Sequence, residues 1–181
     1  MVARFIDGDA AMVLVTEAIK LIFFPAMMAF AASSDFLTMT IANRVSLILV
    51  AGFAVLAVLT GTGASDLLWH VAAAALVLVV VFIFFTRGWI GGGDAKLAAA
   101  TVLWLGFAHL VDYLFYASIL GGALTLAIIY FRKLPLPQAF VGQPWAERLH
   151  RRDSGVPYGI ALAAAALIVY PQTEWMTAVA H

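Results

Sequence analysis

The stretch RGWIGGGDAKLAAATVLWLG, residues 87–106, joins a glycine-rich turn to an apolar segment of about a membrane span's length. Three glycines, residues 91–93, stand immediately before Asp94, and beyond Lys96 the segment carries no charge. Glycine reaches backbone conformations closed to other residues, and it leaves no side chain over the neighbouring backbone. The pattern predicts a helix that begins near Asp94 and holds this carboxylate at the membrane edge, where another chain segment can come close.

The composition is that of an integral membrane protein. Of 181 residues, 65% are hydrophobic and 11% are charged, and the mean hydropathy is +1.03, whereas soluble domains are nearer half apolar and a quarter charged. We therefore expect a single membrane domain that covers residues 1–181. The net charge of zero argues against a nucleic-acid partner, and the absence of cysteine excludes disulfides, thiol chemistry and cysteine-bound zinc. We expect no metal and no cofactor.

Six segments are apolar enough to cross a bilayer, which takes about 20 helical residues. They must be helical, because lipid offers no partner to backbone amides. The predicted fold is therefore an all-α membrane protein with six transmembrane helices. The first segment contains Glu17 and Lys20, so its start is expected nearer Leu21, and the fourth and fifth form a tight hairpin at Asp112. The six ranges are 12–32, 45–61, 67–86, 95–111, 113–131 and 156–175.

The distribution of basic residues predicts the orientation. With six spans, three of the connecting segments share one side, which is rich in Lys and Arg, whereas the other side carries Arg4, with Lys20 ambiguous inside the first span. Basic connections face the cytoplasm, so both termini are expected outside, in the periplasm. The cytoplasmic segments are 33–44, 87–94 and 132–155, and with the flanking Lys96 their basic residues are Arg44, Arg87, Arg132, Lys133, Arg148, Arg151 and Arg152. We interpret the long segment mainly as an orientation signal and a contact for anionic lipids.

Two aspartates fall at this cytoplasmic edge, Asp35 at the end of the first span and Asp94 at the start of the fourth. Two carboxylates held close together share a proton, so one can activate water while the other protonates a departing amine, as in aspartic proteolysis. Each aspartate also has a simpler explanation, as a helix cap or an interfacial residue. His70 and His109 fall near the opposite face, so a Ser–His arrangement at this edge is poorly supported.

Three motifs resemble those of type IV prepilin peptidases, which are membrane aspartic proteases of the G-x-G-D class. GGGDAKL (91–97) is similar to the family's G-x-G-D-x-K-L motif, DFLTMTIANR (35–44) to its first aspartate region, and GVPYGIALA (155–163) to its late Pro-aromatic-Gly element. They occur in the same order as in the family, and together they extend over most of the chain. The small size and the loops most resemble the short prepilin peptidases of Tad (Flp) pilus systems. Ala42 stands where the family often has proline, which bears on loop geometry and substrate preference.

The resemblance implies a membrane aspartic endopeptidase of the bacterial inner membrane, with Asp35 and Asp94 as the catalytic pair. Its partner would be a prepilin, whose short basic leader is cleaved after a glycine that precedes a hydrophobic helix. No methyltransferase activity is expected, because the cysteine-containing loop of the larger family members is absent. The structural alternatives are interfacial anchoring for Lys96 and a helix start for Pro157. Carried over residue by residue, the substrate-binding positions are Asn43, Gly91, Gly93, Lys96, Pro157, Tyr158 and Gly159.

The main alternative is a non-catalytic membrane subunit of a secretion or pilus system, or a small permease, in which the aspartates relay protons or hold a packing contact. A permease should bury ionisable residues near mid-bilayer, whereas these spans are nearly free of charge apart from Glu17 and Lys20. A nearer alternative is an archaeal preflagellin peptidase, which shares the chemistry. The oligomeric state is left open. Polar residues near the outer face are interpreted as ordinary interfacial groups rather than a metal site; they are Asp66, His70, His109 and Asp112.

Overall fold

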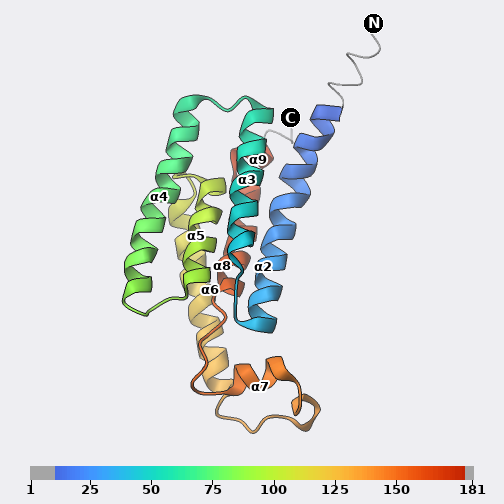
Figure 1. Cartoon of the computed structure of the whole chain (residues 1–181), viewed down its shortest axis with the longest axis vertical. Helices are drawn as coiled ribbons and strands as arrows, with labels where there is room; N and C mark the ends of the chain where they lie inside the picture. The colour runs from blue at the N-terminus through green and yellow to red at the C-terminus, as the bar shows by residue number, and fades with distance from the viewer. Residues whose placement is uncertain (1–10, 178–181) are drawn as a thin grey trace, which may run out of the picture.

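The computed structural model describes residues 11–177, and every regular element in that part of the chain is helical (Figure 1). The predicted all-α fold class is confirmed. The helices stand side by side in a bundle with α5 and α8 inside it, and α7 lies apart at one end (Figure 1). In chain order the elements are η1 (Ile19–Phe23), α2 (Phe24–Thr38), α3 (Asn43–Thr60), α4 (Ala64–Thr86), α5 (Gly92–Leu105), α6 (Leu110–Phe131), η2 (Gln138–Phe140), α7 (Pro144–His150), α8 (Gly159–Val169), η3 (Tyr170–Gln172) and α9 (Glu174–Thr177).

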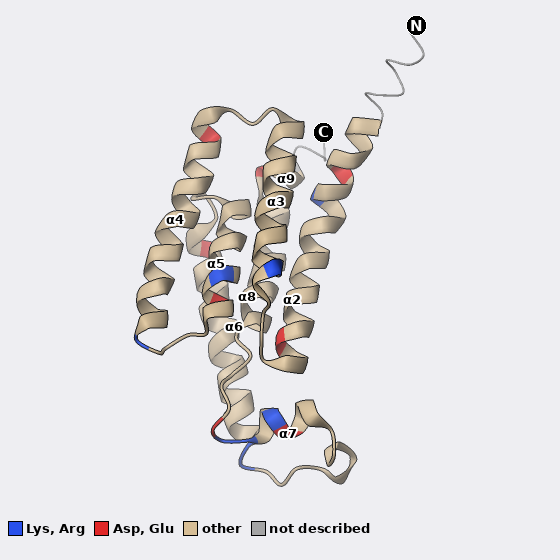
Figure 2. Cartoon of the chain, viewed as in Figure 1, with Lys and Arg blue, Asp and Glu red and all other residues tan. Residues whose placement is uncertain are grey.

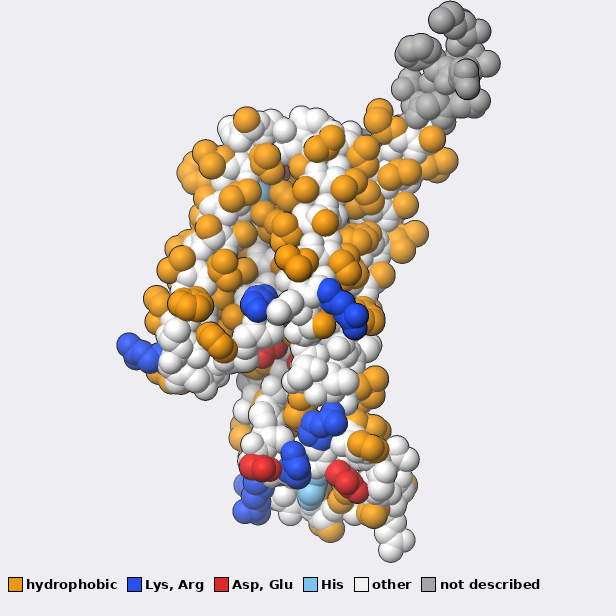
Figure 3. Space-filling model, viewed as in Figure 1, with side chains coloured by type: hydrophobic (Ala, Val, Ile, Leu, Met, Phe, Trp, Pro, Cys, Tyr) orange, Lys and Arg blue, Asp and Glu red, His pale blue; other side chains and the backbone are white. Residues whose placement is uncertain are grey.

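Four helices are long and apolar enough to cross a membrane, and they coincide with the first, second, third and fifth predicted spans. They are Ala11–Thr38, Asn43–Thr60, Ala64–Thr86 and Leu110–Phe131. Their outward faces are covered by apolar side chains (Figure 3); in α4 only Ala73 and Val77 are buried. A continuous apolar surface of this extent is characteristic of contact with lipid rather than water. The architecture is that of a multi-pass membrane protein.

The other two predicted spans, 95–111 and 156–175, correspond to shorter helices. The structure gives α5 14 residues and α8 11 residues, fewer than the roughly 20 needed to cross a bilayer. In α5 every residue from Leu97 to Leu105 is buried, so this helix is surrounded by protein instead of lipid. It packs against α3, α4 and α8, and α8 also packs against α2 and α6. The apolar character of these segments therefore reflects a protein core.

The prediction that the chain turns at Asp112 is wrong. Helix α5 ends at Gly106, which has a left-handed φ of 70°, and the turn to α6 is complete before Leu110, so Asp112 lies in the first turn of α6. A side chain at Gly106 would also be crowded, because a Cβ atom there would lie 3.0 Å from the ring of His70. Glycine adopts this positive-φ conformation without the strain that other residues would have, but within an uninterrupted apolar stretch Gly106 gave no clear signal of a helix end.

The first span does not start near Leu21, as the sequence suggested, but is helical from Ala11 onward. Lys20 is only 7% exposed and pairs with Glu17 at 3.0 Å. A π-helical turn occupies Ile19–Phe23, and the hydroxyl of Tyr170 donates a 2.9 Å hydrogen bond to the carbonyl of Lys20 within this turn. The ion pair and the inserted turn explain how a lysine is accommodated within the membrane-spanning helix.

Segment 132–158, between α6 and α8, is folded against the bundle. Arg132 donates hydrogen bonds to the carbonyls of Leu149 (2.8 Å) and Gly155 (2.7 Å), and Arg148 donates to the carbonyl of Leu37 at the end of α2 (2.7 Å). Figure 2 shows that Lys and Arg residues gather at this end of the molecule, around α7. The segment predicted as the basic connection is thus an ordered unit tied to α2 and α6.

Candidate active site

Asp35 lies in the last turn of α2, where the helix ends in a tight turn. Met39 has a left-handed φ of 52°, and its N–H donates a 2.7 Å hydrogen bond to the carbonyl of Asp35. The carboxylate is buried, with the residue only 4% exposed. Its Oδ2 accepts a 2.7 Å hydrogen bond from the backbone N–H of Gly159, and the amide of Ile160 also interacts with it. The first backbone amides of α8 therefore hold this carboxylate.

Asp94 lies in the first turn of α5 and is half-buried. Gly91, the residue before the helix, is extended, and its backbone amide interacts with the Asp94 carboxylate. This is the helix-capping role that the sequence offered as the simpler explanation for Asp94. The same carboxylate also interacts with the backbone amide of Gly159 and with the charge of Asp35. Helix capping therefore explains only one of the interactions of the Asp94 carboxylate.

The start of α8 joins the two aspartates. The N–H groups at a helix N-terminus point outward and carry partial positive charge, so they stabilise nearby anions. Only glycine allows the approach seen here, because a Cβ atom on Gly159 would lie 2.8 Å from Oδ2 of Asp35. Figure 2 shows the acidic positions at the lower end of α2 and near the start of α5, on the side of the bundle that faces α7. Asp35 and Asp94, two spans apart in the sequence, thus share one amide.

Gly93 and Gly91 have different neighbours. A Cβ atom on Gly93 would lie 3.1 Å from both the carbonyl oxygen and Cβ of Ile41. The absence of a side chain at Gly93 therefore lets α5 begin directly against the turn that follows Asp35. Gly91 is exposed, and a Cβ atom there would lie 3.0 Å from Oδ2 of Asp94. Gly93 thus brings the two aspartate regions together, and Gly91 leaves the exposed edge beside Asp94 free of a side chain.

The structure also joins Lys96 and Asn43, but away from the carboxylates. The ammonium group of Lys96 donates a 2.8 Å hydrogen bond to Oδ1 of Asn43. Both side chains are exposed. Lys96 lies two residues beyond Asp94, roughly 200° around the helix, and among residues 11–177 it forms no ion pair with Asp94. These two residues of the candidate set form a separate polar pair on another face of α5.

The Pro157-Tyr158-Gly159 element lies at the site, and its position depends on Gly121, a residue that was not predicted. Pro157 is buried, and the hydroxyl of half-buried Tyr158 donates a 3.2 Å hydrogen bond to the carbonyl of Ala117. The Tyr158 ring packs on Gly121 of α6, where a Cβ atom would overlap it. Tyr158 also interacts electrostatically with Asp94. The signal for Gly121 was the Gly-Gly pair in the middle of a predicted span.

Three of the four polar residues that were predicted near the outer face line a separate pocket of about 240 Å³. Asp66, His70 and His109 line this pocket, whereas Asp112 does not. The Nδ1 atom of His70 lies 2.8 Å from the carbonyl of Leu103. Within residues 11–177, no group of three or more His, Asp or Glu side chains is arranged to hold a metal ion.

A protein-family comparison relates the sequence of this chain to known proteins. The model of the type IV leader peptidase family matches residues 22–126, more than half of the chain, and this range includes both Asp35 and Asp94. The element at 157–159 lies outside the matched range, yet the structure places it against both aspartates. Neither a curated protein nor a solved structure matches the chain significantly. The chain therefore belongs to the type IV leader peptidase family.

Proposed function

We propose that this protein is a membrane aspartic endopeptidase that removes the short basic leader of type IV prepilins of the Tad (Flp) type, cutting after a glycine. The observation that carries the proposal is the shared amide: Asp35 and Asp94 interact with each other and both meet the backbone N–H of Gly159. Two carboxylates that repel each other hold a single proton between them, which is the state that aspartic proteolysis requires.

The reaction follows from that shared proton. The ionised carboxylate takes a proton from a water molecule as its oxygen attacks the scissile carbonyl, and the protonated carboxyl hydrogen-bonds the carbonyl oxygen. Collapse of the tetrahedral intermediate breaks the C–N bond, and the departing nitrogen receives a proton from the pair. The amide of Gly159, at 2.7 Å from Asp35, stabilises the single negative charge that the pair keeps before and after the reaction.

Four of the remaining predicted positions lie around this centre, whereas Lys96 and Asn43 form a separate polar pair. Exposed Gly91 lies beside Asp94, where an extended substrate backbone can pass without meeting a side chain. Pro157 and Tyr158 would line the opposite side through the start of α8 and its contact with α6. Gly93 contributes indirectly, by letting α5 pack on Ile41.

The membrane arrangement that goes with this function has six hydrophobic segments, with α5 and α8 as shorter inner helices. We place the end that carries α7 in the cytoplasm, because Lys and Arg gather there (Figure 2). Both termini then face the periplasm of a bacterial inner membrane. A prepilin leader would reach the aspartates from the cytoplasm. No methyltransferase activity is proposed, because the chain has no cysteine to build a zinc-binding loop.

The test is cleavage of a Tad-type prepilin co-expressed in membranes with the parent protein, Asp35→Asn or Asp94→Asn, scored by the loss of a leader-sized fragment on a gel. Asparagine keeps the shape of the side chain but cannot share a proton. Loss of cleavage in both variants at parental protein levels supports the proposal. Cleavage at the parental rate by either variant would show that the aspartate is structural. No cleavage by the parent of several candidate prepilins would favour a non-catalytic membrane subunit or a small permease.

A further inference from the structure

A groove of about 630 Å³ opens on the membrane-facing side of the bundle, between α3 and α4, with α5 as its floor. Its floor is made by small and apolar residues, Ala99, Ala100 and Leu103, and its walls are mainly aliphatic. Figure 3 shows this face, with apolar side chains along the recess and a basic side chain at its lower end. The groove is distinct from the basic segment 132–155 and from the aspartates.

One polar group in the groove has no protein partner. Ser46 lines the groove and is 8% exposed, and its hydroxyl oxygen is buried with no hydrogen-bond partner among residues 11–177. A buried hydroxyl without a partner is costly. Because Ser46 lines the groove, rotation of its side chain would bring the covered hydroxyl to a polar atom of a bound molecule.

The open end of the groove carries positive charge. Lys96 and Asn43 line it there, and their 2.8 Å hydrogen bond uses only one of the three donors of the ammonium group. No ion pair to Lys96 occurs in the described part of the chain, and none of the described residues that line the groove is acidic. The charge of Lys96 is therefore available to an anion.

The order of these groups along the groove matches the order of groups in a phospholipid. Lys96 and Asn43 lie at the outer end, Ser46 lies one helical turn further in on α3, and only apolar residues such as Val50 and Leu103 follow. A phospholipid presents a charged phosphate, then ester oxygens, then an acyl chain along the same direction. The volume also lies in the range of ligand-binding pockets, roughly 300–1,000 Å³.

The hydrophobic helix of a substrate fits less well. A membrane-spanning helix, about 10 Å across and about 30 Å long, occupies on the order of 2,400 Å³, several times the volume of the groove. The groove also lies on the face of α5 that bears Lys96, roughly 200° around the helix from Asp94. A substrate bound at the aspartates would have to pass around α5 to reach it.

We propose that this groove is a binding site for one anionic phospholipid of the leaflet on the side of segment 132–155. Its phosphate is held by Lys96 and Asn43, an ester oxygen accepts the hydrogen bond of Ser46, and one acyl chain lies on Ala99 and Ala100. The site is independent of the peptidase reaction and of the prepilin.

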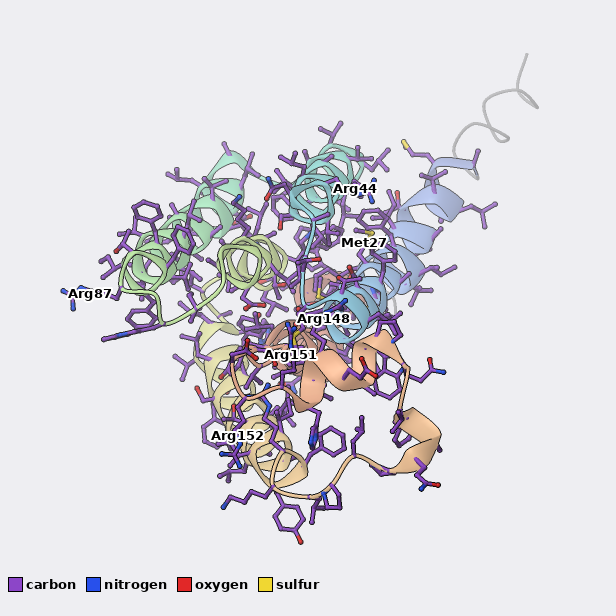
Figure 4. All side chains as sticks on the ribbon, turned by 60° about the horizontal axis from the view of Figure 1, so that its bottom comes forward. Met27, Arg44, Arg87, Arg148, Arg151 and Arg152 are labelled. Carbon is purple, nitrogen blue, oxygen red and sulfur yellow. The ribbon has the colours of Figure 1, made fainter. Side chains whose placement is uncertain are left out.

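The experiment measures which lipid stays bound to the purified full chain. The protein is equilibrated in detergent with equal amounts of phosphatidylglycerol and phosphatidylcholine of the same acyl chains, and retained lipid is identified by native mass spectrometry. We expect preferential retention of phosphatidylglycerol. Lys96→Gln should reduce this preference about fivefold, the effect typical of one basic side chain at an anionic lipid surface. Arg87→Gln is the control, because Arg87 points outward from the end of α4, away from the groove (Figure 4).

A second pair of variants tests the place of the acyl chain. Ala75→Phe should fill the groove and lower retention of both lipids, whereas Leu76→Phe, on an exposed part of α4 that does not line the groove, should not. Equal retention of the two headgroups by the parent, or an equal effect of Lys96→Gln and Arg87→Gln, would overturn the proposal. Photo-crosslinking of a co-expressed prepilin to benzoylphenylalanine at position 75 would also overturn it, because the groove would then hold the substrate.

Discussion

The backbone N–H of Gly159 donates a 2.7 Å hydrogen bond to Oδ2 of Asp35, a residue 124 positions earlier in the chain. The same amide interacts with Asp94. The start of α8 is thus placed where it can stabilise negative charge on either carboxylate. Gly159 therefore contributes to the proposed reaction through its backbone, although it has no side chain.

Substitution of Gly159 should therefore impair cleavage. In Gly159→Ala the new Cβ atom would lie 2.8 Å from Oδ2 of Asp35, so the Asp35 carboxylate or the start of α8 must shift. A displacement of about 1 Å near reacting groups can cost about 100-fold in rate, and we expect a loss of this size in the initial rate of leader cleavage. Gly155→Ala is the matched control, because a Cβ atom there has no neighbour within 4 Å. Parental activity in Gly159→Ala would contradict the proposed role of the amide.

The neighbouring glycines of α6 offer a test of the Tyr158 position. In Gly121→Ala the Cβ atom would overlap the Tyr158 ring, whereas in Gly122→Ala it would meet nothing within 4 Å. We expect Gly121→Ala to displace the ring, break its hydrogen bond to Ala117 and raise KM for the prepilin severalfold. Gly122→Ala should keep parental kinetics and gain about 0.5–1 kcal/mol in stability, because alanine favours the helix.

A double substitution separates packing from substrate contact. If the ring clash is the cause, the thermal stability lost in Gly121→Ala should be recovered in Gly121→Ala/Tyr158→Ala, since the two residues are directly coupled. Additive losses of stability in the double variant would show that Gly121 acts through another neighbour. The measurement is the unfolding temperature of each purified variant in detergent.

Segment 132–158 should be loosened by the loss of Arg148. Its hydrogen bond to the carbonyl of Leu37 ties α7 to the end of α2 (2.7 Å), and Figure 4 shows Arg148 near this junction. A hydrogen bond to a charged group is worth about 1.5–3 kcal/mol, so Arg148→Gln should speed limited proteolysis within the segment at least several-fold. Arg151→Gln should not, because the Arg151 side chain is 66% exposed and its 3.7 Å pair with Asp153 is at the surface. Equal rates for the two variants would exclude this role of Arg148.

The ion pair between half-buried Glu17 and buried Lys20 should matter for stability and not for cleavage. Glu17→Leu leaves the ammonium group of Lys20, only 7% exposed, without its partner, and should destabilise the protein by about 3–5 kcal/mol. The double variant Glu17→Leu/Lys20→Met should restore stability, because the unpaired charge is gone. Asp35 lies fifteen residues further along the same helix, about 22 Å away, so the double variant should cleave at the parental rate. Loss of cleavage in a stable double variant would point to a functional role for the pair.

Some of the proposed site could be predicted from local signals. Asp94 directly follows three glycines and precedes an apolar stretch, so its place in the first turn of a helix follows from helix-start rules. Because two predicted spans separate Asp35 from Asp94, the sequence also predicted that both lie on the same side of the membrane. The hydrogen bond between Lys96 and Asn43 was not predicted, because their 53-residue separation carries no local signal.

The differences between the predicted and the observed helices have a common physical origin. A hydropathy pattern cannot distinguish a helix that faces lipid from one that is buried in protein, because both are apolar. The sequence therefore suggested full spans at 95–111 and 156–175, where the structure has the shorter helices α5 and α8. The position of the turn after α5 depended on Gly106 and its contact with His70, which belongs to a different helix.

Amino-acid composition and the motif sequence by themselves determined the helical membrane class and the family, because lipid contact and helix geometry act on neighbouring residues. They also predicted the aspartate pair that we propose to be catalytic. Only the tertiary structure decided that α8 starts between those aspartates. That placement requires Gly93 to pack on Ile41, Tyr158 to rest on Gly121, and Gly159 to approach Asp35. Each of these contacts joins segments far apart in the chain, and long-range packing of this kind leaves no periodic signal in a single sequence.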